Sequence, residues 1–224
     1  MSARTADYMD AIAHLPEGAT LRLPDIGWNE YEELLNEMAD RPGVRVSYDA
    51  GRVEIMSPLP EHEEYKEFII KLVYVLSEVM GLTLENRGSA TYKWRRGAKG
   101  VEPDTSFYVQ NASRIIGQRT IDLEVDPPPD VTVEIDTTNE SLSKFHIYTA
   151  LGVPEIWRYD GHQAYIYHLA DENYAEATTS RAFPKLTAAA LTEFLEQSKT
   201  QGQTAALVAF RQWLQIRLPS ADNV

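Results

Sequence analysis

The 224-residue chain contains no cysteine, which excludes disulfide bonds, thiolate metal sites and a cysteine nucleophile. It lacks a run of about 18 apolar residues, so we expect no membrane span. Its first residues lack the apolar segment of a secretory signal. These absences favour a soluble cytoplasmic protein. Its length and 43% hydrophobic content are compatible with a single domain over residues 1–224.

The chain is poor in basic residues, with 21 lysines and arginines against 34 acids and a net charge of −13. Proteins that bind nucleic acid tightly through its phosphates are usually basic, so this balance counts against strong non-specific DNA binding. The cations gather locally between residues 86 and 101, interleaved with Tyr92 and Trp94, a pattern compatible with nucleic acid but also with a solvated hairpin. The candidates for nucleic-acid contact in this basic strip are Arg87, Lys93, Arg95 and Arg96.

Motifs of several enzyme classes are also missing. The sequence has no glycine-rich phosphate loop and no G-x-S-x-G elbow. Its five histidines do not have the spacing of zinc ligands. The remaining candidates for chemistry are carboxylates and a lysine.

Hydrophobic periodicity predicts an α/β fold. The clearest helix starts near Glu61, carries apolar residues on one face and ends at Gly81. We expect residues 1–19 to be an irregular lead-in, and Thr137, Thr138 and Asn139 to offer N-caps for a helix over residues 140–151. The other expected helices are 28–39 and two that occupy 187–214 and separate near Gly202. The expected strands are 44–48, 52–56, 82–85, 90–94, 105–109, 131–135, 154–159 and 164–169.

The helix between residues 131–135 and 154–159 makes a β-α-β crossover plausible. We therefore predict a mixed β-sheet flanked by helices, with an added N-terminal helix and β-hairpin. A C-terminal helical extension is expected over about residues 187–218.

Two acids occupy positions that favour apolar residues. Asp104 follows Pro103 at the start of a strand, and Glu134 lies inside the apolar strand Val-Thr-Val-Glu-Ile, where a carboxylate is costly to bury without a cation or several donors. Asp136 would point to the same face as Glu134, and Lys144 on the next helix could return over the strand end. Two converging carboxylates and a strand carbonyl would suit Mg²⁺ or Mn²⁺.

Four segments together resemble the Uma-two family of restriction-endonuclease-like proteins, within the PD-(D/E)XK nuclease superfamily. They are GRVEIMSPLPEHEE, VEPDTSFYV, PPPDVTVEID and SLSKFHIYTALGVPEIWRYD. The resemblance covers roughly residues 28–169 and implies a restriction-endonuclease-like core over about 52–169. That core would contain a helix, a three-stranded meander, a second helix and a further strand.

The resemblance also implies roles for single residues. Asp104 and Glu134 would bind the metal, and the catalytic lysine would be Lys144, displaced onto the helix because Asp136 occupies the usual lysine position. The histidine that follows the Ser-Pro turn in the family corresponds to His62. The implied activity is endonucleolytic hydrolysis of DNA by a metal-activated water, with Asp136 and Tyr148 supporting the site.

Each residue also has a structural interpretation. Asp104 could be a turn residue, and Glu134 could form a structural ion pair with Lys144. Asp136 could cap a helix, and His62 and Tyr148 could simply be packed. The alternative function is a binding or assembly module that keeps the nuclease fold without cleavage. A homodimer that forms a composite DNA groove is also plausible.

Overall fold

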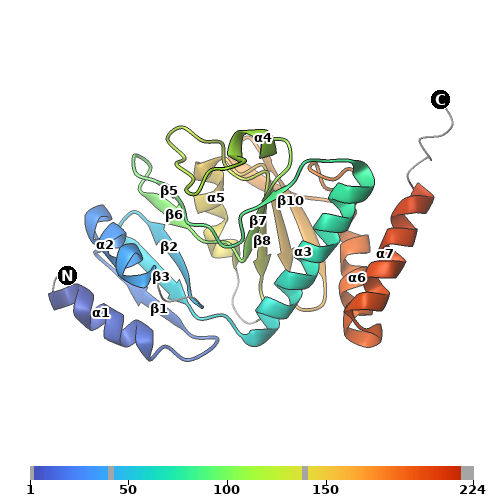
Figure 1. The fold of residues 1–224 in the computed structure, drawn as a ribbon. Coiled ribbons are helices and arrows are strands. Elements are labelled where there is room, and N and C mark those ends of the chain that lie inside the picture. Colours follow the sequence, from blue (N-terminus) through green and yellow to red (C-terminus); the bar gives the residue numbers. More distant parts are fainter. Residues whose placement is uncertain (1–2, 40–42, 138–140, 218–224) are drawn as a thin grey trace.

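The computed structural model describes residues 3–39, 43–137 and 141–217 and contains two β-sheets with helices on their faces (Figure 1). The larger sheet has six strands in the order β11-β10-β9-β8-β7-β4, and the smaller has five in the order β1-β3-β2-β6-β5. The strands of the larger sheet are β4 (Glu85–Asn86), β7 (Thr105–Tyr108), β8 (Val131–Ile135), β9 (Glu155–Tyr159), β10 (Ala164–Ala170) and β11 (Asn173–Ala177). Those of the smaller sheet are β1 (Thr20–Leu23), β2 (Arg45–Asp49), β3 (Arg52–Met56), β5 (Tyr92–Trp94) and β6 (Lys99–Val101).

The larger sheet is antiparallel except for the pair β8 and β9, which is parallel. A 3₁₀ turn, Ser141–Lys144, and α5 (Phe145–Leu151) lie in the connection between these two strands. The predicted crossover and the mixed α/β sheet are therefore confirmed. Because side chains alternate along a strand, Val133 and Ile135 enter the core beneath α3, and Glu134 points to the opposite face, toward α5.

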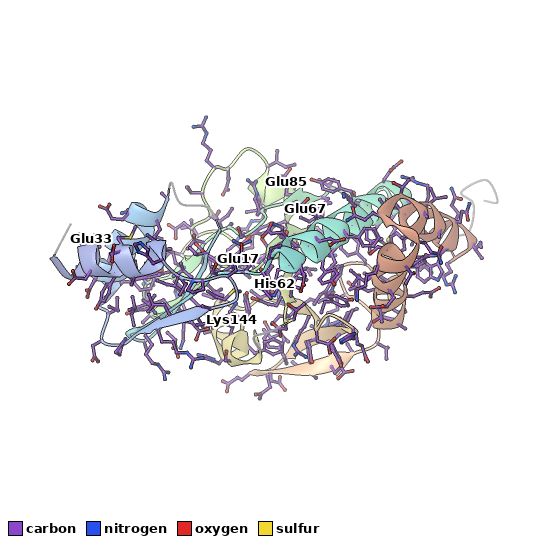
Figure 2. The ribbon with its side chains drawn as sticks, turned by 90° about the horizontal axis from the view of Figure 1, so that it is seen from below. Glu17, Glu33, His62, Glu67, Glu85 and Lys144 are labelled. Atoms are coloured by element: carbon purple, nitrogen blue, oxygen red, sulfur yellow. The ribbon has the colours of Figure 1, made fainter. Side chains whose placement is uncertain are left out.

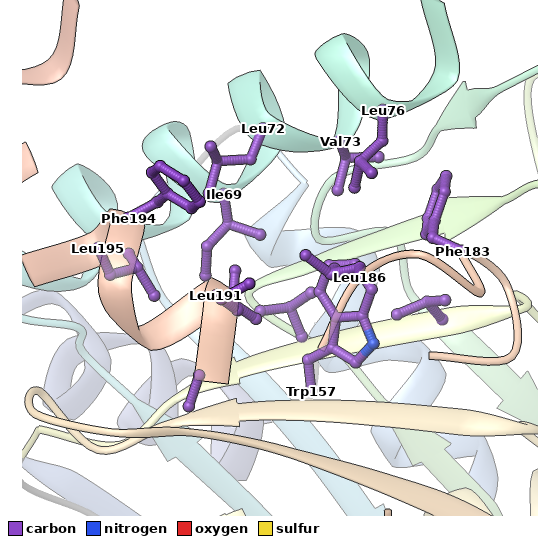
Figure 3. Packing of buried hydrophobic residues seen from close by; sticks show 14 of the residues in the cluster. Ile69, Leu72, Val73, Leu76, Trp157, Phe183, Leu186, Leu191, Phe194 and Leu195 are labelled. Atoms are coloured by element: carbon purple, nitrogen blue, oxygen red, sulfur yellow. The ribbon is translucent and has the colours of Figure 1, made fainter. Parts of the chain in front are cut away.

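One apolar core lies between the larger sheet and the helices α3 (Pro60–Met80), α6 (Ala188–Gln201) and α7 (Gln203–Arg217). Figure 3 shows the apolar side chains of α3 and α6 meeting Trp157 of the sheet. Gly81 ends α3 in the left-handed conformation, at φ 65°, as its position predicted. The predicted pair of C-terminal helices is also present and separates at Gly202.

A second core joins α1 (Ala3–Ala13) and α2 (Trp28–Met38) to the smaller sheet. Tyr31 of α2 is fully buried and stacks on Tyr48 of β2, with ring centroids 4.6 Å apart. A Cβ atom on Gly100 of β6 would overlap the Tyr31 hydroxyl and ring. The glycine therefore lets this helix approach the sheet closely.

Several predicted boundaries were wrong. The expected irregular lead-in over residues 1–19 contains α1, whose apolar residues Met9 and Ile12 are buried against the smaller sheet. In place of the expected strand 82–85 the structure has the shorter and later β4, and the expected strand 90–94 shortens to β5. Sequence analysis missed β1, β6, β11 and the short helix α4 (Ala112–Ile115).

Some predicted features cannot be compared with the structure. Thr138 and Asn139, two of the N-cap candidates, and residue 218 lie outside the described residues. Within the described ranges, no helix is long and apolar enough to cross a membrane.

Candidate active site

Asp104 and Glu134 come together where β7 begins and β8 ends. The Asp104 amide donates to the carbonyl of Val133 at 3.1 Å, and the amide of Ile135 donates to Asp104 Oδ2 at 2.7 Å. These two bonds bracket Glu134 on β8, so the antiparallel pairing of β7 and β8 fixes both acids. Asp104 is 2% exposed and Glu134 1% exposed.

Two side chains from the crossover contact the Glu134 carboxylate. Lys144, the last residue of the 3₁₀ turn, places Nζ 3.0 Å from Glu134 Oε2, and Tyr148 of α5 donates its hydroxyl to Oε1. The ion pair between Glu134 and Lys144 that the sequence suggested is therefore present. Tyr148 approaches from the same side because it lies one helical turn after Lys144.

Burial and neighbouring charges shift the pKa values of Glu134 and Lys144. Burial raises the pKa of Glu134 to about 7; the Lys144 ammonium opposes this rise, and the neighbouring charges of Asp104 and Asp136 add to it. Burial lowers the pKa of Lys144, but the charges of Glu134 and Asp104 outweigh it and keep that pKa above its ordinary value. The lysine therefore stays charged while Glu134 can exchange a proton near neutral pH.

Arg45, at the start of β2, is a buried cation that sequence analysis missed. Its Nε lies 3.6 Å from Asp104 Oδ1, and its Nη2 donates to Glu63 of α3 at 3.0 Å. Neither Arg45 Nε nor Asp104 Oδ1 has a hydrogen-bond partner among the described residues. Nothing in the sequence marked this arginine, because its burial results from the smaller sheet lying beside α3 and β7.

His62 is buried in the first turn of α3, with Nε2 2.6 Å from the hydroxyl oxygen of Thr137. Burial lowers its pKa, although Asp104 and Asp136 partly oppose this, so the imidazole is neutral at neutral pH. Within the described residues its Nδ1 has no hydrogen-bond partner. Figure 2 shows His62 at the start of α3, near Lys144.

Asp136 follows β8 on the side of Glu134, as predicted. It accepts a hydrogen bond from Arg158 of β9, the residue paired with Glu134 in the parallel register. Arg158, on the neighbouring strand β9, therefore supplies the positive charge beside Asp136. The structure thus brings together all six candidate site residues, which are His62, Asp104, Glu134, Asp136, Lys144 and Tyr148.

Each side chain proposed for nucleic-acid contact in the basic strip has a protein partner. Lys93 and Arg95 pair with Glu32 of α2, and Arg96 pairs with Glu124 at 3.4 Å. Arg87 pairs with Glu85 and also donates to backbone carbonyls. Acids from other elements therefore offset much of the charge of the strip.

The donor set at the two carboxylates fits a hard divalent cation. Asp104 Oδ1 is buried without a hydrogen-bond partner among the described residues, and an ionised Glu134 keeps lone pairs beyond those used by Lys144 and Tyr148. The described part of the chain holds no group of three His, Cys, Asp or Glu side chains arranged for a metal. Two carboxylates suit Mg²⁺ or Mn²⁺, which keep several waters, better than zinc with four protein ligands.

The comparison with protein families agrees with the resemblance seen in the sequence. The family Uma2, described as "Putative restriction endonuclease", matches residues 28–200. A solved structure from Anabaena variabilis ATCC 29413, described as "a putative nuclease belonging to DUF820", is 17% identical, with a TM-score of 0.47. The similarity covers 72% of this chain and 98% of that one. No curated protein matches the chain.

Proposed function

The chain belongs to the Uma2 family, and from that premise we propose that it is a Mg²⁺- or Mn²⁺-dependent endonuclease that hydrolyses phosphodiester bonds of DNA. One observation carries the proposal. Asp104 and Glu134 lie together on neighbouring strands, and Lys144 Nζ is 3.0 Å from the Glu134 carboxylate. Two acids and an amine in one buried site can supply metal ligands and a positive charge for phosphodiester hydrolysis.

Each residue would have a distinct role. Asp104 and Glu134 would hold the cation, which when bound stabilises charge on the phosphodiester and lowers the pKa of a water molecule. Lys144 would orient the attacking water or stabilise the negative charge that develops on the phosphoryl oxygens. Tyr148 would hold the Glu134 carboxylate in place through its hydrogen bond.

Two further residues would support the site without contacting the reacting atoms. His62 would fix the start of α3 beside Asp104 through its contact with Thr137. Asp136, neutralised by Arg158, would shape the charge around Glu134. Because replacing residues that orient metal ligands typically changes metal affinity or activity by about 10–100-fold, their loss should weaken the site rather than abolish it.

A nuclease assay tests this proposal. Plasmid DNA is incubated with the protein and Mg²⁺, Mn²⁺ or EDTA, and the Asp104→Asn variant is compared with Asp10→Asn, a change at a side chain that is 79% exposed on α1. We expect cleavage with either ion, none with EDTA, and a loss of about a hundredfold or more in Asp104→Asn alone. Equal cleavage by Asp104→Asn and wild type would overturn the catalytic proposal.

The second candidate is a binding or assembly module that keeps the fold without cleavage. It is favoured by the net charge of −13 and by the acids that pair with Lys93, Arg95 and Arg96. Such a module would show no metal-dependent cleavage and no Mn²⁺ binding. Those two results together would replace the endonuclease proposal.

A further inference from the structure

A cavity of about 490 Å³ opens beside Lys144, between the smaller sheet and α5. Its walls include Arg22 of β1, Asp49 of β2 and Arg52 of β3 on one side, and Lys144 and His146 on the other. Its volume lies within the range of about 300–1,000 Å³ that is usual for small-ligand pockets. Lys144 lines this cavity and also contacts Glu134, so one side chain separates an occupant from the carboxylates.

The cavity carries more positive charge than the chain as a whole. Three of its lining side chains are cations, Arg22, Arg52 and Lys144, against the two acids Asp49 and Glu54. Overall, by contrast, the chain has a net charge of −13. A local excess of cations in an acidic protein would attract an anionic ligand to this cavity.

Arg22 and Arg52 have guanidinium N–H groups beyond those that their ion pairs use. Arg22 pairs with Glu54 at 2.9 Å, Arg52 pairs with Asp49 at 2.9 Å, and their side chains are 79% and 76% exposed. Each guanidinium forms one ion pair among the described residues, and its remaining N–H groups can bind another anion. A planar guanidinium fork matches the oxygens of a phosphate group.

Asp49 does not cancel this charge. His146 lies 2.9 Å from its carboxylate, and Lys99 and Arg52 also pair with it. The carboxylate is therefore already surrounded by basic groups, and it holds Arg52 and His146 at the cavity wall. The exposed ring of Pro24 lines the same cavity and can pack against a sugar or base.

We propose that this cavity binds one nucleotide of the DNA strand next to the phosphodiester at Lys144. Its phosphate would lie on Arg22 and Arg52 and its nucleoside against the apolar wall. This inference rests on the proposed function for the identity of the strand. The nucleotide chemistry itself follows from the cations and the wall of the cavity.

Binding of 2′-deoxyadenosine 5′-monophosphate and of a fluorescein-labelled ten-nucleotide DNA strand, both in EDTA, tests the proposal without cleavage. We expect Arg22→Ala and Arg52→Ala each to weaken both ligands about tenfold, the loss of one charge-assisted hydrogen bond. Deoxyadenosine, which lacks the phosphate, should bind wild type at least about tenfold more weakly. The matched control is Arg211→Ala, which removes an arginine of α7 that pairs with Glu78 at 2.9 Å and should change nothing.

The outcomes separate this inference from the proposed function. Unaltered binding in both cavity variants, with unchanged melting temperatures, would overturn the nucleotide site. Binding of the mononucleotide that the DNA strand fails to displace would also overturn it, in favour of a pocket for free nucleotide. If wild type binds both ligands through these arginines but cleaves no DNA with Mg²⁺ or Mn²⁺, the endonuclease proposal fails and the nucleotide site stands. If wild type cleaves, the variants should raise KM about tenfold at unchanged kcat.

Discussion

Replacing Lys144 by methionine removes the cation that contacts Glu134 and leaves a side chain of similar length. The side chains of the pair are 12% and 2% exposed, so solvent cannot compensate for the lost charge. Breaking a buried ion pair on one side typically costs about 3–5 kcal/mol of unfolding free energy. Glu134 can lower that cost by taking up a proton, and the loss therefore depends on pH.

The sign of this dependence follows from the pKa of Glu134. In wild type it is about 7 in the folded protein, above the ordinary 4.5. The folded state therefore binds more protons between these values, and wild-type stability falls as the pH rises through that window. Above about pH 7 the wild-type group is ionised in both states and its contribution is constant.

In Lys144→Met the fall in stability continues above pH 7, because burial and the charges of Asp104 and Asp136 then raise the pKa of Glu134 against the Tyr148 hydrogen bond without the opposing charge of Lys144. Each pH unit changes the unfolding free energy by about 1.4 kcal/mol for one proton. The unfolding free energy of the variant should therefore fall by about 3 kcal/mol more than that of wild type between about pH 7 and pH 9. Between about pH 6 and pH 7 the difference between the two proteins should hardly change. This magnitude agrees with the lower end of the cost of breaking a buried pair.

Urea unfolding followed by tryptophan fluorescence at several pH values measures the difference. The control is Lys66→Met, which removes a lysine that pairs with the 47% exposed Glu63. Burial raises the pKa of Glu63, but the hydrogen bond and charge of Lys66 outweigh it and hold that pKa below its ordinary value. The unfolding free energy that Lys66→Met loses relative to wild type should therefore not change with pH above about pH 7. Equal destabilisation of Lys144→Met at about pH 6 and pH 9 would refute the assignment of the raised pKa to Glu134.

Two further substitutions test the fold and the site. Gly100→Ala places a methyl group against the buried Tyr31 and should lower the unfolding free energy by about 1–3 kcal/mol; an unchanged urea midpoint would contradict the close approach of α2. Tyr148→Phe removes the hydrogen bond to Glu134 and should weaken Mn²⁺ binding about tenfold in calorimetry at pH 7, because the carboxyl then holds its proton more tightly. Unaltered affinity would show that the hydroxyl does not support the ionised carboxylate.

Much of the fold could be predicted from local patterns. The apolar face of α3 and the stop at Gly81 are local features, and each forms as expected. The missed strand β11 pairs with the adjacent strand β10 and is largely polar. The missed strand β6 is short, and pairing with β2, far away in the sequence, stabilises it. Local propensity contains no information about such partners.

The site was only partly predictable for the same reason. Glu134 drew attention because a carboxylate inside an apolar strand needs a partner, and the structure supplies Lys144 and Tyr148. Arg45 gave no such signal, since a charged residue at the start of a strand is usually exposed. Its burial depends on how the smaller sheet meets α3, which no single segment determines.

Calorimetric titration with Mn²⁺ near pH 7, on wild type and Asp104→Asn, tests the central claim most directly. We predict one ion bound per chain in wild type, binding weakened by at least about tenfold in the variant, and proton release as Glu134 ionises, since its pKa is about 7. The buffer dependence of the heat measures that release. An absence of binding, or equal affinity in the two proteins, would contradict the assignment of Asp104 and Glu134 as the pair that holds the cation.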